Sequence, residues 1–404
     1  MADICDLASH RFKTLNNDYT DIEAEGYAKR VGVDPRPKET LDEIDERGAF
    51  IRQANYFLEP FGNKDTKDTI NNKYGIYWKH SCHWSNRPVI VRDILGLEDV
   101  IYEQHVTPTG ESNVYGHGFN DQDDHKDKKT GFYFLSEAYK NADPGFKGRA
   151  TTPTIVDLNT KKAVNNDYHR MTNYIEVYFR PYQKTDIDLY PKLYRKEIDE
   201  FNDWLFPTIN NGHYRMAFCQ SYEAYKEAYN DFFDNLEKLD KRLETNRFLF
   251  GDYILDSDIR LYVTLVRWET SYYRNVGPIK KRITEYKNIW GYVLDLFSIP
   301  VFRKYTFFEF PNNSIGLFRP YPERIASKID YDKEWISDGK RRNLSNDPDN
   351  VYLHTSIDYS DYVTEISKSH WNNKSWEDRN PFNRNISVDP TINPLKGLLK
   401  NNNR

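Results

Sequence analysis

The sequence predicts an α/β domain followed by an all-α domain. Short runs of alternating apolar residues lie between residues 74 and 165, separated by helical or turn-forming segments. From residue 188 onward the apolar residues recur instead at helical spacing. Strands in one half of a chain and helices in the other are typical of two successive domains, for which 404 residues suffice.

Two strand-containing units make up the predicted α/β domain. The first is expected to hold a strand (74–78), a helix (87–97), a strand (100–106), a polar loop over the active face (110–131) and a short helix (132–141). The second is expected to hold a strand, a polar turn, a strand and a helix, at residues 151–157, 158–161, 162–165 and 168–178. This order is that of a thioredoxin-like fold, in which Pro153 would be a cis-proline facing the active thiol.

Four amphipathic stripes predict the helices of the second domain: residues 190–210, 222–246, 256–268 and 282–297. The expected divisions are an irregular N-terminal extension (1–70), the thioredoxin-like domain (71–182), the all-α domain (188–310), an insertion or lid (311–385) and a C-terminal tail (386–404). The insertion carries large aromatic residues that include Phe318, Tyr321, Tyr331, Trp335, Tyr352, Tyr359, Trp371 and Trp376. We expect it to cover the substrate entrance, because a merely solvated loop has no use for them.

Cys82 is the candidate reactive residue. It lies between a predicted strand and a predicted helix, so its thiol stands at the amino end of that helix. Unpaired amide hydrogens and the helix dipole favour a thiolate over a thiol there. Ser85 occupies the position where a dithiol enzyme carries its second cysteine, so we expect one attacking sulfur that an external thiol resolves. Cys5 and Cys219 are expected to be passive.

Composition indicates a reducing compartment. Three cysteines without paired spacing predict no disulfide framework, and the start lacks a basic region followed by an apolar stretch. No apolar run approaches the ~20 residues that span a bilayer. A net charge of -5 gives no electrostatic case for nucleic acid. We therefore expect a cytoplasmic protein with neither membrane nor nucleic-acid partners. No metal site is predicted, because the residues near the thiol match no standard ligand spacing: Cys82, His80, His83 and His117.

Several segments, taken in order, carry a resemblance to one enzyme family. They are residues 92–100 (RDILGLEDV), 142–149 (ADPGFKGR), 209–218 (INNGHYRMAF), 248–252 (FLFGD), 258–267 (DIRLYVTLVR) and 390–394 (PTINP). Over roughly residues 45–310 the chain resembles the glutathionyl-hydroquinone reductases, the xi class of glutathione transferases, which is related to the omega class. The resemblance implies an all-α glutathione transferase domain after the thioredoxin-like domain, and a homodimer.

The family resemblance also implies a reaction and a set of site residues. In that reaction a cysteine attacks the sulfur of a glutathionyl-hydroquinone, the hydroquinone leaves, and a second glutathione resolves the mixed disulfide. Carried over to this chain, catalysis falls on Cys82, with Tyr214 for the hydroxyl of a quinone-type or aromatic substrate. His83, beside the thiol, is a further catalytic candidate that comes from this chain and not from the family pattern. Binding of glutathione, the co-substrate, falls on His117, Arg149, Thr152, Pro153, Asp167 and Tyr168. Tyr272 and Tyr273 are assigned to core packing.

The chain departs from the family pattern at the thiol and in the glutathione pocket. The family has Cys-Pro-Trp-Ala-His-Arg where this chain has residues 82–87 (CHWSNR), Glu-Ser where it has Asp167-Tyr168, and Trp where it has His117. Leu255 replaces a helix-capping Thr, which leaves Asp256 as the candidate cap.

Three hypotheses about function follow from the family pattern and its changes. The leading one is thiol transfer or reductive deglutathionylation of an aromatic or quinone conjugate through a Cys82 mixed disulfide. The second is an enzyme of the same fold that uses another thiol, or a pair of Cys82 with His83 or His117, for conjugating, lyase or isomerase chemistry. The third is a non-catalytic binding or structural protein.

Overall fold

The computed structural model describes residues 21–33, 43–108, 115–119, 122–308, 331–337, 340–355, 366 and 388–401. Most of the predicted insertion therefore lies outside the described residues. The same holds for Cys5 and for these aromatic residues: Phe318, Tyr321, Tyr359, Trp371 and Trp376.

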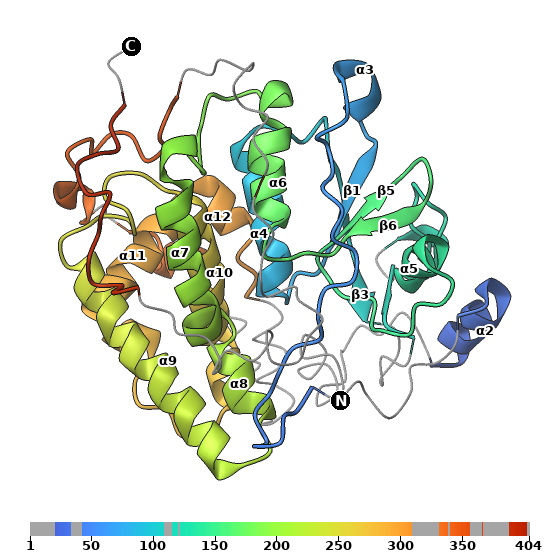
Figure 1. Ribbon diagram of the computed structural model, residues 1–404, viewed down its shortest axis with the longest axis horizontal. Helices are drawn as coiled ribbons and strands as arrows, with labels where there is room; N and C mark the ends of the chain where they lie inside the picture. Colours follow the sequence, from blue (N-terminus) through green and yellow to red (C-terminus); the bar gives the residue numbers. More distant parts are fainter. Residues whose placement is uncertain are drawn as a thin grey trace.

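A four-stranded sheet forms the centre of the first domain (Figure 1). Its strands lie in the order β2-β1-β5-β6, with these bounds: β1 (Tyr74–Trp78), β2 (Tyr102–His105), β5 (Thr154–Asp157) and β6 (Lys162–Asn165). β1 pairs in parallel with β2 and antiparallel with β5, which pairs antiparallel with β6. One parallel and two antiparallel pairings in this order confirm the predicted thioredoxin-like sheet.

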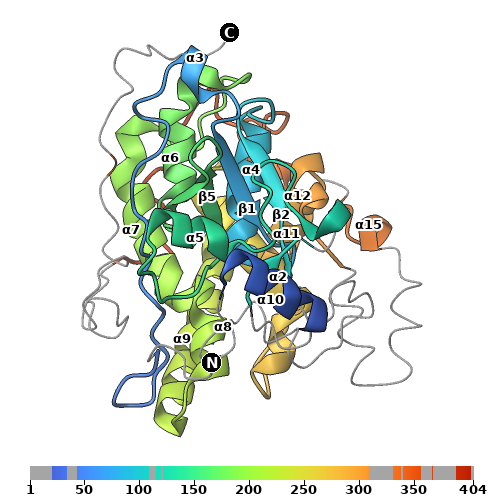
Figure 2. The ribbon, with the colours of Figure 1, turned by 90° about the vertical axis from the view of Figure 1, so that its right-hand side faces the viewer.

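Helices cover both faces of this sheet (Figure 2). Ile76 and Ile155 pack into the core that α4 (His83–Ile94) and α6 (Met171–Tyr178) share. Tyr77 and Val156, the next residues along the two strands, pack with α5 (Ser136–Ala142) on the opposite face. Because successive side chains of a strand point to opposite faces, β1 is buried along its whole length.

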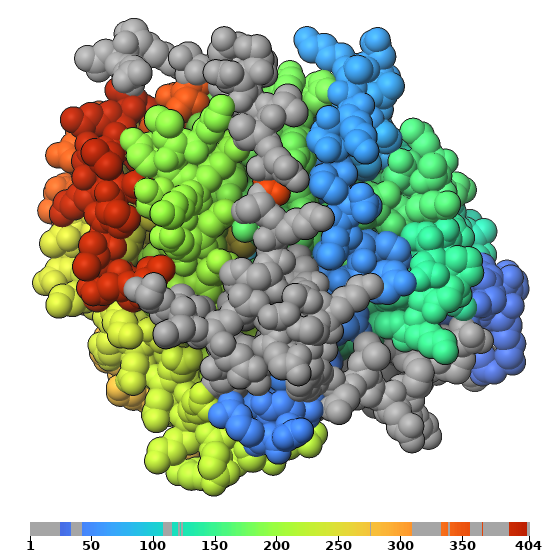
Figure 3. Space-filling model, viewed as in Figure 1, coloured from blue at the N-terminus to red at the C-terminus, as the bar shows by residue number. Residues whose placement is uncertain are grey.

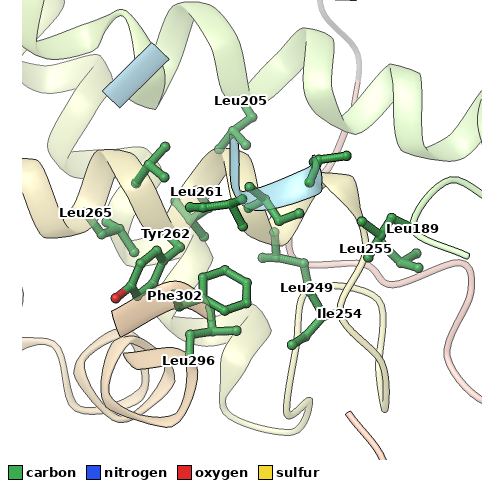
Figure 4. Close-up of a cluster of buried hydrophobic side chains, with 14 of the residues drawn as sticks. Leu189, Leu205, Leu249, Ile254, Leu255, Leu261, Tyr262, Leu265, Leu296 and Phe302 are labelled. Carbon is green, nitrogen blue, oxygen red and sulfur yellow. The ribbon is translucent and has the colours of Figure 1, made fainter. Parts of the chain in front are cut away.

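The second domain is helical and is built around α10 (Asp256–Thr270), which is buried throughout. The other helices are α7 (Arg195–Leu205), α8 (Gly212–Phe218), α9 (Tyr222–Leu243), α11 (Lys287–Phe297) and α12 (Pro300–Lys304). Figure 4 shows Leu261, Tyr262 and Leu265 of α10 among Leu205 of α7, Leu296 of α11 and Phe302 of α12. The α/β and all-α fold class is thereby confirmed.

The remaining elements are short. They are α2 (Asp21–Val31), α3 (Lys67–Ile70), α15 (Tyr331–Glu334), β3 (Thr107–Pro108) and β4 (His117–Gly118). Single turns lie at Asp123–His125, Arg180–Tyr182, Lys192–Tyr194, Phe206–Asn210, Tyr272–Asn275, Ile283–Glu285 and Arg342–Leu344. No helix in the described ranges is both long enough and apolar enough to span a bilayer.

Most helices begin within a few residues of the expected positions, but α4 and the N-terminal extension differ from the expectation in kind. α4 begins at His83 rather than at residue 87, with Pro88 inside it, because Cys82 is the residue that caps the helix. α2 lies within the N-terminal extension that was expected to be irregular.

A segment from Glu43 to Thr66 crosses both domains before the first strand; it is called the N-terminal strap here. At its start, the amide of Gln220, between α8 and α9, donates to the carbonyl of Gly48 at 2.7 Å. In its middle, the amide of Phe57 donates to Asn166 Oδ1 at 2.9 Å, next to β6. Figures 1 and 3 show the strap (blue) running upward past α6 to α3.

The start of α10 is held by Asp258. The sequence had suggested Asp256 for this role. Both oxygens of Asp258 accept backbone amides, Oδ1 from Leu249 and Oδ2 from Leu255, each at 2.9 Å. The phenol of Tyr292 donates to Oδ1 at 3.0 Å. The predicted Asp256 cap was wrong because the carboxylate of Asp256 accepts hydrogen bonds from the side chains of Thr172, Asn202 and Arg260 instead.

Asp258→Asn tests this cap and its pH dependence. Burial raises the pKa of Asp258 to about 6, so the folded chain holds this proton more tightly than the unfolded chain does. The group therefore makes stability fall as pH rises from about 4 to about 6, and the variant loses that slope. An amide also leaves a backbone donor unpaired, which costs about 1–3 kcal/mol. Urea unfolding across pH measures both effects.

The exposed Asp234 on α9 gives the matched control, because Asp234→Asn changes no buried hydrogen bond. Its unfolding profile should follow that of the parent. A pH slope that survives in Asp258→Asn would contradict the assignment.

Candidate functional site

Cys82 caps the amino end of α4 and faces the loop before β5. Its carbonyl accepts the amides of Ser85 and Asn86 at 3.0 and 3.1 Å, which closes the first turn. The side chain is fully buried, and its thiol donates to the carbonyl of Thr152 at 3.8 Å. The Thr152–Pro153 peptide bond is cis, as the sequence predicted. The hydroxyl of Ser85 donates to that of Thr152 at 3.3 Å, so the turn and the loop are joined twice.

His83 points toward the second domain. Its Nδ1 lies 2.9 Å from Thr264 Oγ1 on α10. The hydroxyl of Thr264 donates to the carbonyl of Arg260 and accepts from Asn210 Nδ2, so it can only accept from His83. The proton is therefore on Nδ1. Burial lowers the pKa of His83 well below 6.5, so this imidazole is neutral.

Two tyrosines of the second domain reach the thiol turn. The phenol of Tyr214 on α8 lies 3.3 Å from that of Tyr272, which follows α10. Tyr272 also donates to the carbonyl of Ser81, next to Cys82, at 3.3 Å. The ring of His213 stacks on Tyr272 with centroids 3.9 Å apart. The sequence pointed to Tyr214, but it gave Tyr272 a packing role because only the folded chain brings that phenol to the thiol turn.

Arg52 enters the site from the N-terminal strap. Its Nε donates to Asn211 Oδ1 at 2.9 Å, and its guanidinium carbon lies 4.4 Å from the ring centroid of Tyr214. The same carbon lies 4.8 Å from the ring of Trp84 and 5.6 Å from that of Tyr168. Arg52 was not among the residues expected at the site, because an isolated arginine in a polar extension carries no local signal.

The Asp167–Tyr168 pair lies at the start of α6. Asp167 Oδ1 accepts the amides of His169 and Arg170 at 3.1 and 3.2 Å, so this carboxylate caps its own turn. The ring of Tyr168 packs against Trp84 with centroids 4.9 Å apart. Burial raises the pKa of Tyr168 to about 12, so the phenol is neutral near pH 7.

Arg149 and His117 have other contacts. Arg149 Nη2 forms an ion pair with Glu43 of the strap at 2.9 Å, and its amide donates to Gln53 Oε1 at 3.2 Å. His117 is buried in β4, where it pairs with Pro108 of β3. The structure thus gathers the thiol turn, the cis-proline loop and the start of α6 at the domain interface, while Arg149 anchors the strap. Within the described ranges, no group of three or more His, Cys, Asp or Glu residues has the arrangement of a metal site.

Comparisons with known proteins identify this architecture. Residues 222–294 match the family described as the glutathione S-transferase C-terminal domain. The xi glutathione S-transferase of Phanerochaete chrysosporium superimposes with a TM-score of 0.62 at 28% identity, over 72% of this chain and 95% of that one. The glutathione-bound structure of YqjG from Escherichia coli K-12 gives 0.57 at 30% identity, over 68% and 92%.

The chain therefore has a glutathione transferase fold with its thiol turn at the domain interface. In sequence it is 33% identical to the glutathionyl-hydroquinone reductase YqjG of Escherichia coli K12 over 231 residues, 57% of this chain and 70% of that protein. It is 34% identical to PcpF of Sphingobium chlorophenolicum, another glutathionyl-hydroquinone reductase, over 54% of this chain and 69% of that protein. The chain belongs to the glutathionyl-hydroquinone reductases, the xi class of glutathione transferases, as the sequence indicated.

The two buried histidines of the site should stay neutral across the physiological range. Burial lowers the pKa of both His83 and His213 well below 6.5. Their ring carbon resonances should therefore not shift between about pH 6 and pH 8. NMR of the parent, with His83→Gln and His213→Gln to assign the signals, measures this directly. A titration midpoint near 6.5 for either ring would contradict the described burial.

Proposed function

We propose that this chain is a glutathione-dependent reductase that removes the glutathionyl group from aromatic, quinol-type conjugates through Cys82. The observation that carries the proposal is the single thiol at the amino end of α4, facing the cis-proline loop and next to the Tyr214–Tyr272 pair. The site lies in a chain of the glutathionyl-hydroquinone reductase family, whose relatives bear that activity in their names.

The reaction has two steps. The thiolate of Cys82 attacks the glutathione sulfur of the conjugate, the carbon–sulfur bond breaks, and its electron pair stays on the aromatic carbon, which takes up a proton. The products are the free hydroquinone and a mixed disulfide between Cys82 and glutathione. The thiolate of a second glutathione then attacks the mixed disulfide, which yields glutathione disulfide and restores the thiolate of Cys82.

The residues around Cys82 suit this chemistry. The amino end of α4 offers amide hydrogens and a positive dipole end to a thiolate. We assign the proton that the aromatic carbon receives to the Tyr214–Tyr272 phenol pair, since both phenols are buried next to the thiol turn. The glutathione backbone is assigned to the loop at Thr152 and Pro153. Its γ-glutamyl end is assigned to the start of α6, and a homodimer and a cytoplasmic location complete the proposal.

Replacing Cys82 by serine should abolish the reaction. Cys82→Ser leaves no sulfur to form the mixed disulfide, so turnover of a glutathionyl-hydroquinone should fall to background. In the parent, peptide mass spectrometry after a single turnover should find glutathione disulfide-linked to the peptide that contains Cys82. Cys219→Ser is the control, because burial raises the pKa of Cys219 and its thiol donates to the carbonyl of Met216. Full turnover in Cys82→Ser would refute the mechanism.

Removing one phenol should slow the step that needs a proton. Tyr214→Phe should lower kcat for the conjugate by about 100-fold, the scale of a lost general acid, with little change in KM. Reduction of the isolated mixed disulfide by glutathione should keep its rate, because that half of the cycle protonates no carbon. Tyr273→Phe, at a partly buried position next to Tyr272, is the matched control. Equal losses in both half-reactions would indicate a general structural effect instead.

A further inference from the structure

Arg87 is a buried cation without a hydrogen-bond partner. It lies in the second turn of α4, is 1% exposed, and none of its three guanidinium nitrogens has a partner. The other buried arginines of the described chain each donate to at least one oxygen: Arg92, Arg170, Arg180, Arg215, Arg242, Arg247, Arg260, Arg267 and Arg341. The charges of Asp256 and Cys82 lie near Arg87 but give its guanidinium no hydrogen bond, so an anion that bonds it directly would stabilise this buried cation.

Trp84 presents a second unused donor beside Arg87. Its indole N–H is buried and has no hydrogen-bond partner. The guanidinium carbon of Arg87 lies 4.6 Å from the Trp84 ring centroid, as expected for residues three apart on a helix. The guanidinium carbon of Arg52 lies 4.8 Å from the same ring. Two guanidinium groups therefore lie against the Trp84 ring, whose own N–H has no hydrogen-bond partner.

The carboxylates near this cluster are engaged elsewhere. Asp256 accepts from Arg260 Nε at 2.6 Å and from Asn202 at 3.0 Å. Burial raises the pKa of Glu176 well above its usual value, which weakens this carboxyl as a source of negative charge. Burial also lowers the pKa of Arg87 to about 9, which fits a guanidinium that lacks a full counter-charge.

We propose that Arg87 and the indole N–H of Trp84 bind a carboxylate of the thiol co-substrate and so make the site selective for anionic thiols. The inference rests on the proposed function, since it names the class of thiol used at that site. A carboxylate is planar, and its two oxygens match the guanidinium fork. Trp84 lies two residues after Cys82, and its ring packs on Tyr168 of the segment assigned to the γ-glutamyl end. Glutathione supplies such a carboxylate.

Thermal unfolding with and without S-methylglutathione tests the proposal without any turnover. In Arg87→Met the ligand-free Tm should rise, because an unpaired buried charge is replaced by an apolar side chain. The increase in Tm produced by the ligand should largely vanish, with affinity about 10- to 100-fold weaker. Arg87→Lys keeps the charge but loses the two parallel donors of the guanidinium. Its affinity for the ligand should lie between that of the parent and that of Arg87→Met. Trp84→Phe should weaken binding by about threefold to tenfold through loss of one donor.

Arg92→Met is the matched control on the same helix. Arg92 donates to the carbonyl of Ile101 and pairs with Asp93, so its loss should lower Tm and leave ligand affinity unchanged. The diethyl ester of S-methylglutathione lacks both carboxylates. It should bind the parent at least about 10-fold more weakly than the acid, and this preference should disappear in Arg87→Met.

Two results would overturn the proposal. One is a lower ligand-free Tm in Arg87→Met together with unchanged affinity for S-methylglutathione, which would make Arg87 a structural cation. The other is equal binding of the acid and its diester by the parent. A parent protein that binds the acid through Arg87 but does not deglutathionylate aromatic conjugates would contradict the proposed function alone.

Discussion

The buried ion pair between Asp256 and Arg260 is the constraint on which the arrangement of the two domains depends. Arg260 Nε donates to Asp256 Oδ2 at 2.6 Å within the first turn and a half of α10. Two charges in a protein interior are tolerated only when further hydrogen bonds satisfy their remaining atoms. Asn202 of the same domain supplies one such bond, and the other domain supplies two: Thr172 donates to Asp256 at 2.8 Å, and Arg260 Nη2 donates to the carbonyl of His169 at 2.7 Å. A shift of one domain relative to the other would break these hydrogen bonds and leave both buried charges without these partners. The ion pair therefore fixes the position of α10 relative to the start of α6.

That register determines what surrounds the thiol. α10 packs along α4, and the hydroxyl of Thr264 then lies where it fixes the proton of His83 on Nδ1. One turn further along α10, Arg267 Nη2 donates to the carbonyl of His80, two residues before Cys82. Tyr272 follows at the end of the helix and reaches the carbonyl of Ser81. The thiol turn belongs to the first domain, but three residues of the second domain hold it by hydrogen bonds: Thr264, Arg267 and Tyr272.

The strands were predictable from the sequence because their signals are local. Alternation at Tyr74–Trp78 and the polar turn between β5 and β6 gave the right elements with nearly the right ends. The start of α4 was missed because Pro88 resembles a helix-initiating proline, whereas the backbone already turns helical at His83. Cys82 and Tyr214 could be singled out from short motifs.

The partners of these residues could not be found in the same way. Arg52, Thr264 and Tyr272 come to the site from positions far apart in the chain, and no periodicity or motif marks them. Asp256 was taken for a helix cap because its position in sequence fits one. Only the fold shows that its carboxylate serves the domain interface, and that Asp258 holds the backbone amides instead.

The N-terminal strap has a consequence for the order in which the site forms during synthesis. The strap leaves the ribosome before either domain, yet its contacts are with Gln220 beyond α8, with Asn166 beside β6, and with Asn211. It cannot settle until residues more than 150 positions later have been made and packed. Arg52 is therefore among the last groups to reach the site, although it is translated before the residues of both domains that it contacts. Until then, the rings of Trp84 and Tyr214 lack the guanidinium that packs against them in the folded chain.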